Sequence, residues 1–301
     1  MREFALTKVG TSRDSRKKRW WPFVLLCVLT LLRWTFGERL SLGSTGLSEV
    51  VGCGSACILA LTLATRWRVP RPKATLLLEA ALSGALMLVG PLLWIFVRSV
   101  SMDEASLTMT LALAPVVVAV ARPAFRPTEG ANLAGRLWPG IAAIAGLLLL
   151  LPEPSLSNAR RDVLLAAIPL ATGLGAAWFR AREGDRLWRA SMALAGAALA
   201  FLVAAVMQGS GHWHGLGLPA VLDGALALLS VLTVLRLGAT RWSGQFVLLP
   251  LAVIVEGLLI LHIKMDVRYA VGIALLLLAT VFLLLPPKAD DTGNLGLQEA
   301  E

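Results

Sequence analysis

The feature that most constrains this chain is a series of apolar runs, each close to twenty residues long, separated by short polar segments. A run of about twenty residues crosses a hydrocarbon core of about 30 Å when it is a helix rising about 1.5 Å per residue. A backbone in lipid must satisfy its own hydrogen bonds, so each run must be helical. The runs do not alternate polar with apolar residues, which argues against a transmembrane β-barrel. The sequence therefore predicts an all-α, polytopic membrane protein.

The composition agrees with this prediction and excludes an ordinary soluble domain. Hydrophobic residues make up 57% of the 301 residues and charged residues 16%, with a mean hydropathy of +0.74. A soluble domain carries about 25% charged residues to cover its surface. The net charge of +9 is spread over many loops and forms no single basic patch. We therefore expect no nucleic-acid partner.

We expect about ten transmembrane helices, of which the first begins at Trp20 and Trp21, an aromatic pair typical of a membrane interface. A cleaved signal peptide is the alternative for this start, but no small-residue cleavage site follows the run and Arg33 interrupts its end. A basic tail over 1–19 and an acidic tail over 287–301 flank the spans. The predicted spans are 20–36, 47–65, 74–97, 104–121, 137–152, 162–179, 190–207, 218–235, 243–262 and 269–286.

Lys and Arg residues are distributed unevenly between the two sides that these spans define. With the N-terminus inside, 21 of the 28 Lys and Arg residues fall in cytoplasmic segments and 6 in outer segments. Positive residues accumulate on the cytoplasmic side, and one missed span would reverse every later loop. We therefore predict that both termini are cytoplasmic. Sparse lysine and abundant Leu, Ala and Arg favour a bacterial inner membrane.

The fourth and ninth spans share an arrangement of residues. Each has a proline within its apolar run, Pro115 in the fourth and Pro250 in the ninth. Each is followed by a polar stretch and then by a span that opens on glycine and ends on proline, Gly140 to Pro152 and Gly272 to Pro286. The chain is therefore predicted to contain an internal repeat of five helices.

The two repeats extend over 20–152 and 162–286, called here the first half and the second half. Because five is odd, the second copy enters the membrane from the opposite side. The halves should then superpose after a two-fold rotation about an axis in the membrane plane. Such inverted repeats are typical of secondary transporters.

This arrangement resembles the drug/metabolite transporter superfamily, EamA type, over nearly the whole chain and most of all over 103–152 and 244–287. The resemblance implies a transporter that moves a small organic solute or metabolite by alternating access. Either a proton or the solute's own gradient would supply the energy. The family often carries a glutamate at the end of the fourth and ninth helices. Glu129 lies near that place in the first half, whereas His262 and Lys264 occupy it in the second.

Enzyme signatures are absent from the sequence. It lacks the G-x-x-x-x-G-K-[ST] loop that holds ATP phosphates and the H-E-x-x-H zinc motif. His212 and His214 offer two ligands in an external loop, fewer than a zinc site requires. We therefore expect no enzyme, metal or cofactor, and the expected partners are membrane lipid and a small-molecule substrate. The alternative function is a membrane-embedded enzyme that acts on a lipid or lipid-linked substrate.

Charged residues inside the predicted spans are the candidates for substrate binding or proton coupling, since they are costly in lipid and usually face an interior. Glu256 lies deepest, where a carboxylate needs a cationic partner, a substrate amine, a proton or water. Asp223, Glu79 and Arg33 complete the set, and Arg33 is the cation nearest to Glu256 in depth. Arg33 and Glu49 lie near the outer surface, so their simpler interpretation is that both side chains extend along their helices to reach it.

Prolines and tryptophans mark other positions of interest in the spans. Pro115, Pro250 and Pro91 are candidate helix bends, because proline removes one helical hydrogen bond. Tryptophans near span ends commonly anchor a helix at the membrane interface. We expect this role for Trp94, Trp178 and Trp242.

Small residues in the spans indicate where helices approach each other closely. Gly84, Gly175 and Gly196 permit close packing or bending. Cys53 and Cys57 lie four residues apart on one helix face among glycine, serine and alanine. Close packing is the simpler interpretation of this pair, and a thiol site is the alternative.

The topology can be tested with a reporter fused to the C-terminus. A reporter active only outside the cytosol should give no signal there, because an even number of spans returns the chain to the cytoplasmic side. Activity in intact cells is the measurement, and a fusion within the outer loop after the first span is the positive control. A strong signal from the C-terminal fusion would refute the ten-helix topology.

Overall fold

A computed structural model describes residues 10–36, 46–92, 110–125, 133–150, 159–182, 184–208, 217–261 and 266–285. All regular structure in these residues is α-helical, as predicted. The helices are α1 (Gly10–Phe36), α2 (Gly46–Arg66), α3 (Ala74–Leu92), α6 (Ala114–Phe125), α7 (Leu133–Leu150), α8 (Ala159–Ala181), α9 (Arg186–Gln208), α10 (Gly217–Leu237), α11 (Ala239–Ser243), α12 (Gln245–Leu261) and α13 (Val267–Leu284).

Most helices follow the predicted spans, but α1 and α6 differ from them. α1 begins at Gly10, so the helix continues into the basic tail. In the fourth span Thr110 and Leu111 are helical, a turn follows at 112–113, and α6 begins only at Ala114. Pro115 has no N–H to donate, so the helix is interrupted directly before it.

Several helices have the length and composition needed to cross a membrane. Within the described residues these are Leu47–Arg66, Arg186–Val206, Gly217–Leu237 and Val267–Leu284. Shorter apolar helices are Trp20–Arg33, Ala74–Val89, Ala114–Phe125 and Leu137–Leu150. Large apolar side chains such as Ile58, Val206 and Val221 point outward from the bundle. Because apolar side chains lie on both the inner and the outer faces, the fold is compatible with an integral membrane protein.

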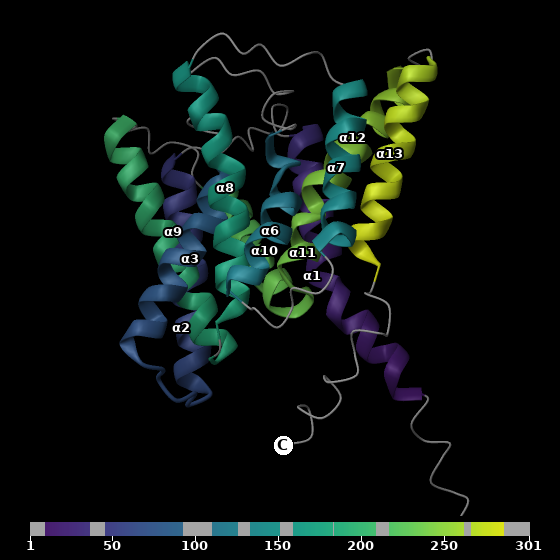
Figure 1. The fold of residues 1–301 in the computed structure, drawn as a ribbon. Helices are drawn as coiled ribbons and strands as arrows, with labels where there is room; N and C mark the ends of the chain where they lie inside the picture. The colour runs from purple at the N-terminus through teal and green to yellow at the C-terminus, as the bar shows by residue number, and fades with distance from the viewer. Residues whose placement is uncertain are drawn as a thin grey trace, which may run out of the picture.

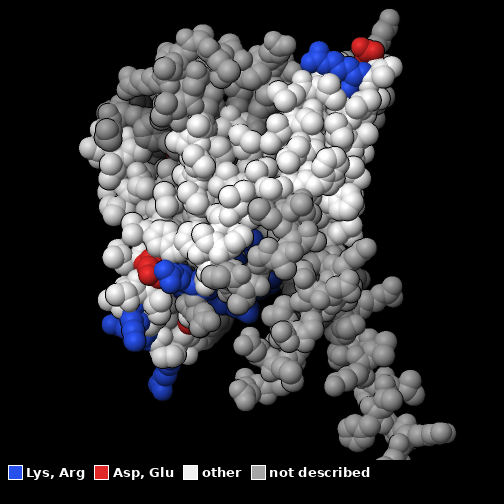
Figure 2. All heavy atoms as spheres, viewed as in Figure 1, with Lys and Arg blue, Asp and Glu red and all other residues white. Residues whose placement is uncertain are grey.

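Successive helices run in alternate directions, so the bundle has two distinct ends (Figure 1). α2 and α10 finish at one end, and α3 and α9 begin there. The start of α1 lies at the same end, because Arg241 and Arg236 lie over the rings of Trp20 and Trp21, 5.5 and 5.3 Å from the centroids. Figure 2 shows most of the visible Lys and Arg side chains gathered there. We call this the basic end. The opposite end, where α1 finishes and α2 and α10 begin, is called the far end.

Glycines let helices of the first half touch the backbone of helices of the second half. A Cβ atom on Gly52 of α2 would lie 2.4 Å from the carbonyl oxygen of Ala220 in α10. A Cβ atom on Gly196 of α9 would lie 2.1 Å from the carbonyl oxygen of Ala81 in α3. No side chain fits at such distances. The close packing predicted for Gly196 is therefore confirmed.

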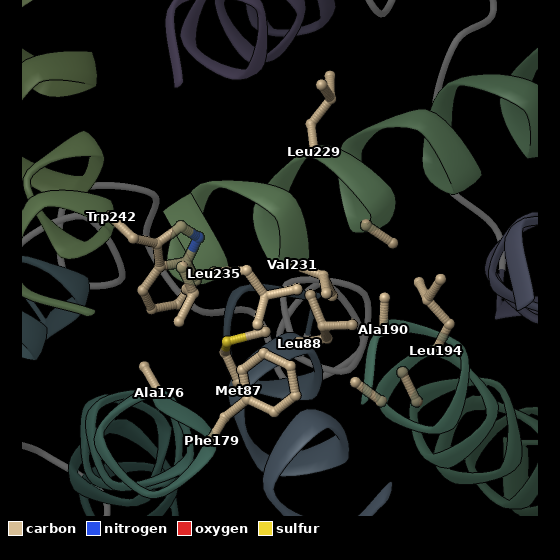
Figure 3. Close-up of a cluster of buried hydrophobic side chains, with 14 of the residues drawn as sticks. Met87, Leu88, Ala176, Phe179, Ala190, Leu194, Leu229, Val231, Leu235 and Trp242 are labelled. Atoms are coloured by element: carbon tan, nitrogen blue, oxygen red, sulfur yellow. The ribbon is translucent and has the colours of Figure 1, made fainter. Parts of the chain in front are cut away.

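Among the described residues, the larger of two buried apolar clusters draws on every helix except α7 and α13. In Figure 3, Met87 of α3 lies beside Phe179 of α8, and Leu235 of α10 and Trp242 of α11 approach them from the other side. Trp242 is fully buried and packs edge-to-face on Phe246 with ring centroids 5.3 Å apart. The expectation that Trp242 is an interfacial anchor is therefore wrong, because the short helix α11 turns the ring into the core.

We expect Gly52→Ala to lower the melting temperature of the purified protein in detergent. The added Cβ would meet the Ala220 carbonyl oxygen and the Gly224 nitrogen, which are backbone atoms that cannot move independently of α10. Overpacking of this kind costs about 1–3 kcal/mol. Gly54→Ala is the matched control on the same helix, because nothing lies within 4 Å of a Cβ there. Equal melting temperatures for the two variants would contradict the contact between α2 and α10.

Candidate functional site

The candidate site is centred on Asp223, which lies in the second turn of α10 and is 2% exposed. Both of its carboxylate oxygens accept a hydrogen bond from another helix. Nη1 of Arg33 donates to Oδ1 at 2.5 Å, and Oγ of Ser48 donates to Oδ2 at 2.6 Å. The three groups come from α1, α2 and α10, so this contact joins the two halves of the chain.

Arg33 and the neighbouring Glu49 lie in terminal turns of their helices, where the helix dipole favours their charges. Arg33 lies in the last turn of α1, and partial negative charge at that end of a helix favours a cation. Glu49 lies in the first turn of α2, where partial positive charge favours an anion. The end of α1 and the starts of α2 and α10 all meet at the far end. The site is therefore assembled from three helix termini.

Arg33 and Glu49 do not extend to the outer surface, so the simpler interpretation of both residues is wrong. The Arg33 side chain is only 15% exposed and is turned onto Asp223. Glu49 follows Ser48 and is 1% exposed. The physical reason is that α2 packs against both α9 and α10, which places the first turn of α2 inside the bundle.

Glu79 lies at the basic end, apart from the Asp223 site. It occupies the second turn of α3, and Nε of Arg182, directly after α8, lies 2.9 Å from its Oε2 atom. The two side chains are 29% and 46% exposed. Ion pairs in such exposed settings stabilise a protein by about 0–1 kcal/mol.

The remaining candidates are placed only by their backbone. Glu256 lies within α12, but its side chain is outside the described residues. Its role in substrate binding or coupling therefore stays a prediction. Pro250 lies inside the continuous helix α12, whereas Pro115 follows the break that precedes α6. Pro91 lies in the last turn of α3, and its side chain is outside the described part of the chain.

The structure thus brings two of the predicted residues together, Arg33 and Asp223, and adds Ser48, which the sequence analysis did not consider. Two adjacent polar residues at the start of an apolar span, Ser48 and Glu49, were the available signal. The first turn of a span usually borders water, and for that reason Glu49 was assigned to the surface. Within the described residues, no three His, Cys, Asp or Glu side chains form a group that could hold a metal ion.

No known protein family matches the sequence of this chain, and no curated protein matches it. A solved structure described only as "Crystal structure of protein" is similar to it, with a TM-score of 0.60 over 86% of this chain and 94% of that chain. The two sequences are 16% identical. At this identity the similarity is one of fold alone.

We expect Ser48→Ala to lower the melting temperature, because it removes one of the hydrogen bonds that Asp223 accepts in the core. Losing a hydrogen bond to a buried charged group costs about 1.5–3 kcal/mol. Ser55→Ala is the matched control on the same helix, since the Ser55 hydroxyl donates to the carbonyl oxygen of Gly52 in its own helix at 2.9 Å. Thermal unfolding of both variants in the same detergent is the measurement. If Ser55→Ala lowered the melting temperature as much as Ser48→Ala, the hydrogen bond to Asp223 would have no special role in stability.

Proposed function

We propose that this protein is a secondary transporter that moves a small organic solute across a bacterial inner membrane by alternating access. The proposal includes ten spans in two inverted repeats, cytoplasmic termini, and membership of the EamA-type drug/metabolite transporters that the sequence resembles. One observation carries it, namely the way in which the helices of the two halves pack on each other.

In an inverted repeat, α1, α2 and α3 would correspond to α8, α9 and α10, and α7 would correspond to α13. Exchanging every helix for its counterpart turns the contact of α2 with α10 into that of α9 with α3, and both contacts exist. The same exchange turns the contact of α1 with α10 into that of α8 with α3, and again both exist. The contacts of α2 with α9 and of α7 with α13 exchange onto themselves. This regularity supports a two-fold relation between the halves.

The two proline-containing helices follow the same rule. α6 and α12 would be counterparts, and each begins directly after a turn, at 112–113 before α6 and at Gly244 before α12. Helices interrupted within the membrane leave backbone groups available to a solute, and transporter repeats place them beside the substrate site. Pro115 supports the proposal through the break directly before it, whereas Pro250 lies inside α12, six residues after Gly244.

An inverted repeat also supplies the mechanism. Two halves of similar fold and opposite orientation need not have identical conformations at any one time. If the halves exchange their conformations, the opening moves from one end of the bundle to the other, and alternating access results. At Gly52 and Gly196 the halves meet backbone against backbone, which is how helices associate closely in lipid.

Reconstituted transport is the test of this proposal. The purified chain in liposomes should move at least one of the amino acids, organic cations, nucleosides or nucleotide sugars faster than protein-free liposomes do, with and without an imposed proton gradient. For a proton-coupled solute, Glu256→Gln should transport poorly and lose the pH dependence, because glutamine keeps the shape and cannot ionise. Solute flux by mass spectrometry is the measurement, and an unchanged melting temperature shows that the variant is folded.

Two results would contradict these expectations separately. Flux equal to that of protein-free liposomes for every solute class, from a folded and correctly inserted protein, would refute the transporter. Wild-type flux and pH profile in Glu256→Gln would refute the role of Glu256 and leave the transporter intact.

A further inference from the structure

Within the described residues, two ion pairs join the halves of the chain, one at each end of the bundle. Arg33 of the first half contacts Asp223 of the second half at the far end. Glu79 of the first half contacts Arg182 of the second half at the basic end. Both pairs are formed in the same structure.

The two pairs occupy similar places in the two halves. Arg33 lies in the last turn of α1, and Arg182 directly follows the end of α8, which is the counterpart of α1. Asp223 is the seventh residue of α10, and Glu79 is the sixth residue of α3, which is the counterpart of α10. Exchanging the halves therefore brings one ion pair to within about one helical turn of the other, with the charge of each member preserved.

Each pair bridges helices that have to separate if its end of the bundle opens. α1 packs on α10, and the Arg33–Asp223 pair joins these two helices. α3 packs on α8, and the Glu79–Arg182 pair joins α3 to the residue that follows α8. Moving α1 from α10 would separate Arg33 from Asp223 in a setting where both side chains are largely buried. Buried charges that lose their partner require water. Rupture of this pair and hydration of the far end are therefore coupled.

We propose that these two ion pairs are reciprocal latches: Arg33–Asp223 closes the far end, Arg182–Glu79 closes the basic end, and each half-cycle opens one of them while the other stays formed. The proposal rests on the alternating-access function proposed above. It assigns to Arg33, Asp223, Glu79 and Arg182 a role in holding conformations, without requiring any of them to contact the solute.

Thiol accessibility in nanodiscs tests the latches, because a membrane-impermeant methanethiosulfonate then reaches both ends. Cys53, which is fully buried within two turns of Ser48 on α2, reports on the far end in a chain with Cys27→Ala and Cys57→Ala. Ser83→Cys reports on the basic end in a chain whose three cysteines are replaced by alanine. Ser83 is fully buried and its hydroxyl donates to the Glu79 carbonyl oxygen at 2.6 Å. Modification rates are measured by intact mass.

Reciprocal changes are the expected result. Arg33→Gln should raise the modification rate of Cys53 by about tenfold or more and lower that of Ser83→Cys, because loss of a buried partner shifts the population toward the far-open state. Arg182→Gln should raise the rate of Ser83→Cys and lower that of Cys53. Exchanging the charges, with Arg33→Asp and Asp223→Arg together, should restore protection of Cys53. Arg66→Gln is the control: Arg66 is an exposed residue at the basic end that belongs to neither pair, so its replacement should change neither rate.

Three outcomes would overturn the latches: unchanged rates in both Arg33→Gln and Arg182→Gln, acceleration of both reporters by either variant, or failure of the charge exchange to protect Cys53. If Arg33→Gln does not fold, Arg182→Gln decides alone, since its pair is half-exposed and tolerates substitution. If the two modification rates change in opposite directions but the protein moves no solute, the transporter proposal is refuted and the exchange between two conformations still holds. If the protein transports a solute but neither variant changes the modification rate of either reporter, only the latches are refuted.

Discussion

Backbone contact between helices of the two halves is the constraint on which the rest of this structure depends. Lipid provides no hydrophobic force between helices, so they associate through close van der Waals packing, which requires small residues at the contact. Gly52 meets Gly224 where α2 crosses α10, and Gly146 meets Gly272 where α7 crosses α13. With these crossings set, the rotation of each helix about its axis is set as well, and so is the side chain that each helix presents to its neighbour.

The polar site follows from one of these crossings. Ser48 lies one turn before Gly52 on α2, and Asp223 directly precedes Gly224 on α10. Contact between the two glycines therefore brings the Ser48 hydroxyl to the Asp223 carboxylate, where Arg33 completes the arrangement. Removing one member of a buried ion pair costs about 3–5 kcal/mol, because the other charge stays buried. Small residues and the charged cluster are thus one structural unit, although they look unrelated along the sequence.

The sequence predicted the helices, and close packing at Gly196, better than it predicted the site. Apolar run length and the backbone's need for hydrogen bonds determine where helices lie, and Pro115 marked the break before α6. The pairing of charged side chains is harder to predict. The sequence indicates how deep each residue lies in the membrane, but not which helices are neighbours. Arg33 was compared with Glu256 by depth, whereas α1 packs on α10 and pairs Arg33 with Asp223. Glu49 and Trp242 were misplaced for the same reason, because position near a span end does not reveal which neighbour covers it.

The ion pairs at the two ends of the bundle differ in burial. At the far end the ion pair is buried and reinforced by Ser48, whereas at the basic end Glu79 and Arg182 are partly exposed to solvent. Solvent screens an exposed pair, whereas a buried pair loses solvation that the mutual attraction of its members has to offset. Loss of one partner should therefore have the larger effect at the far end, where the remaining charge stays buried. In the proposed transporter, opening the far end would require water to reach Arg33 and Asp223, whereas opening the basic end would separate a pair that solvent already reaches.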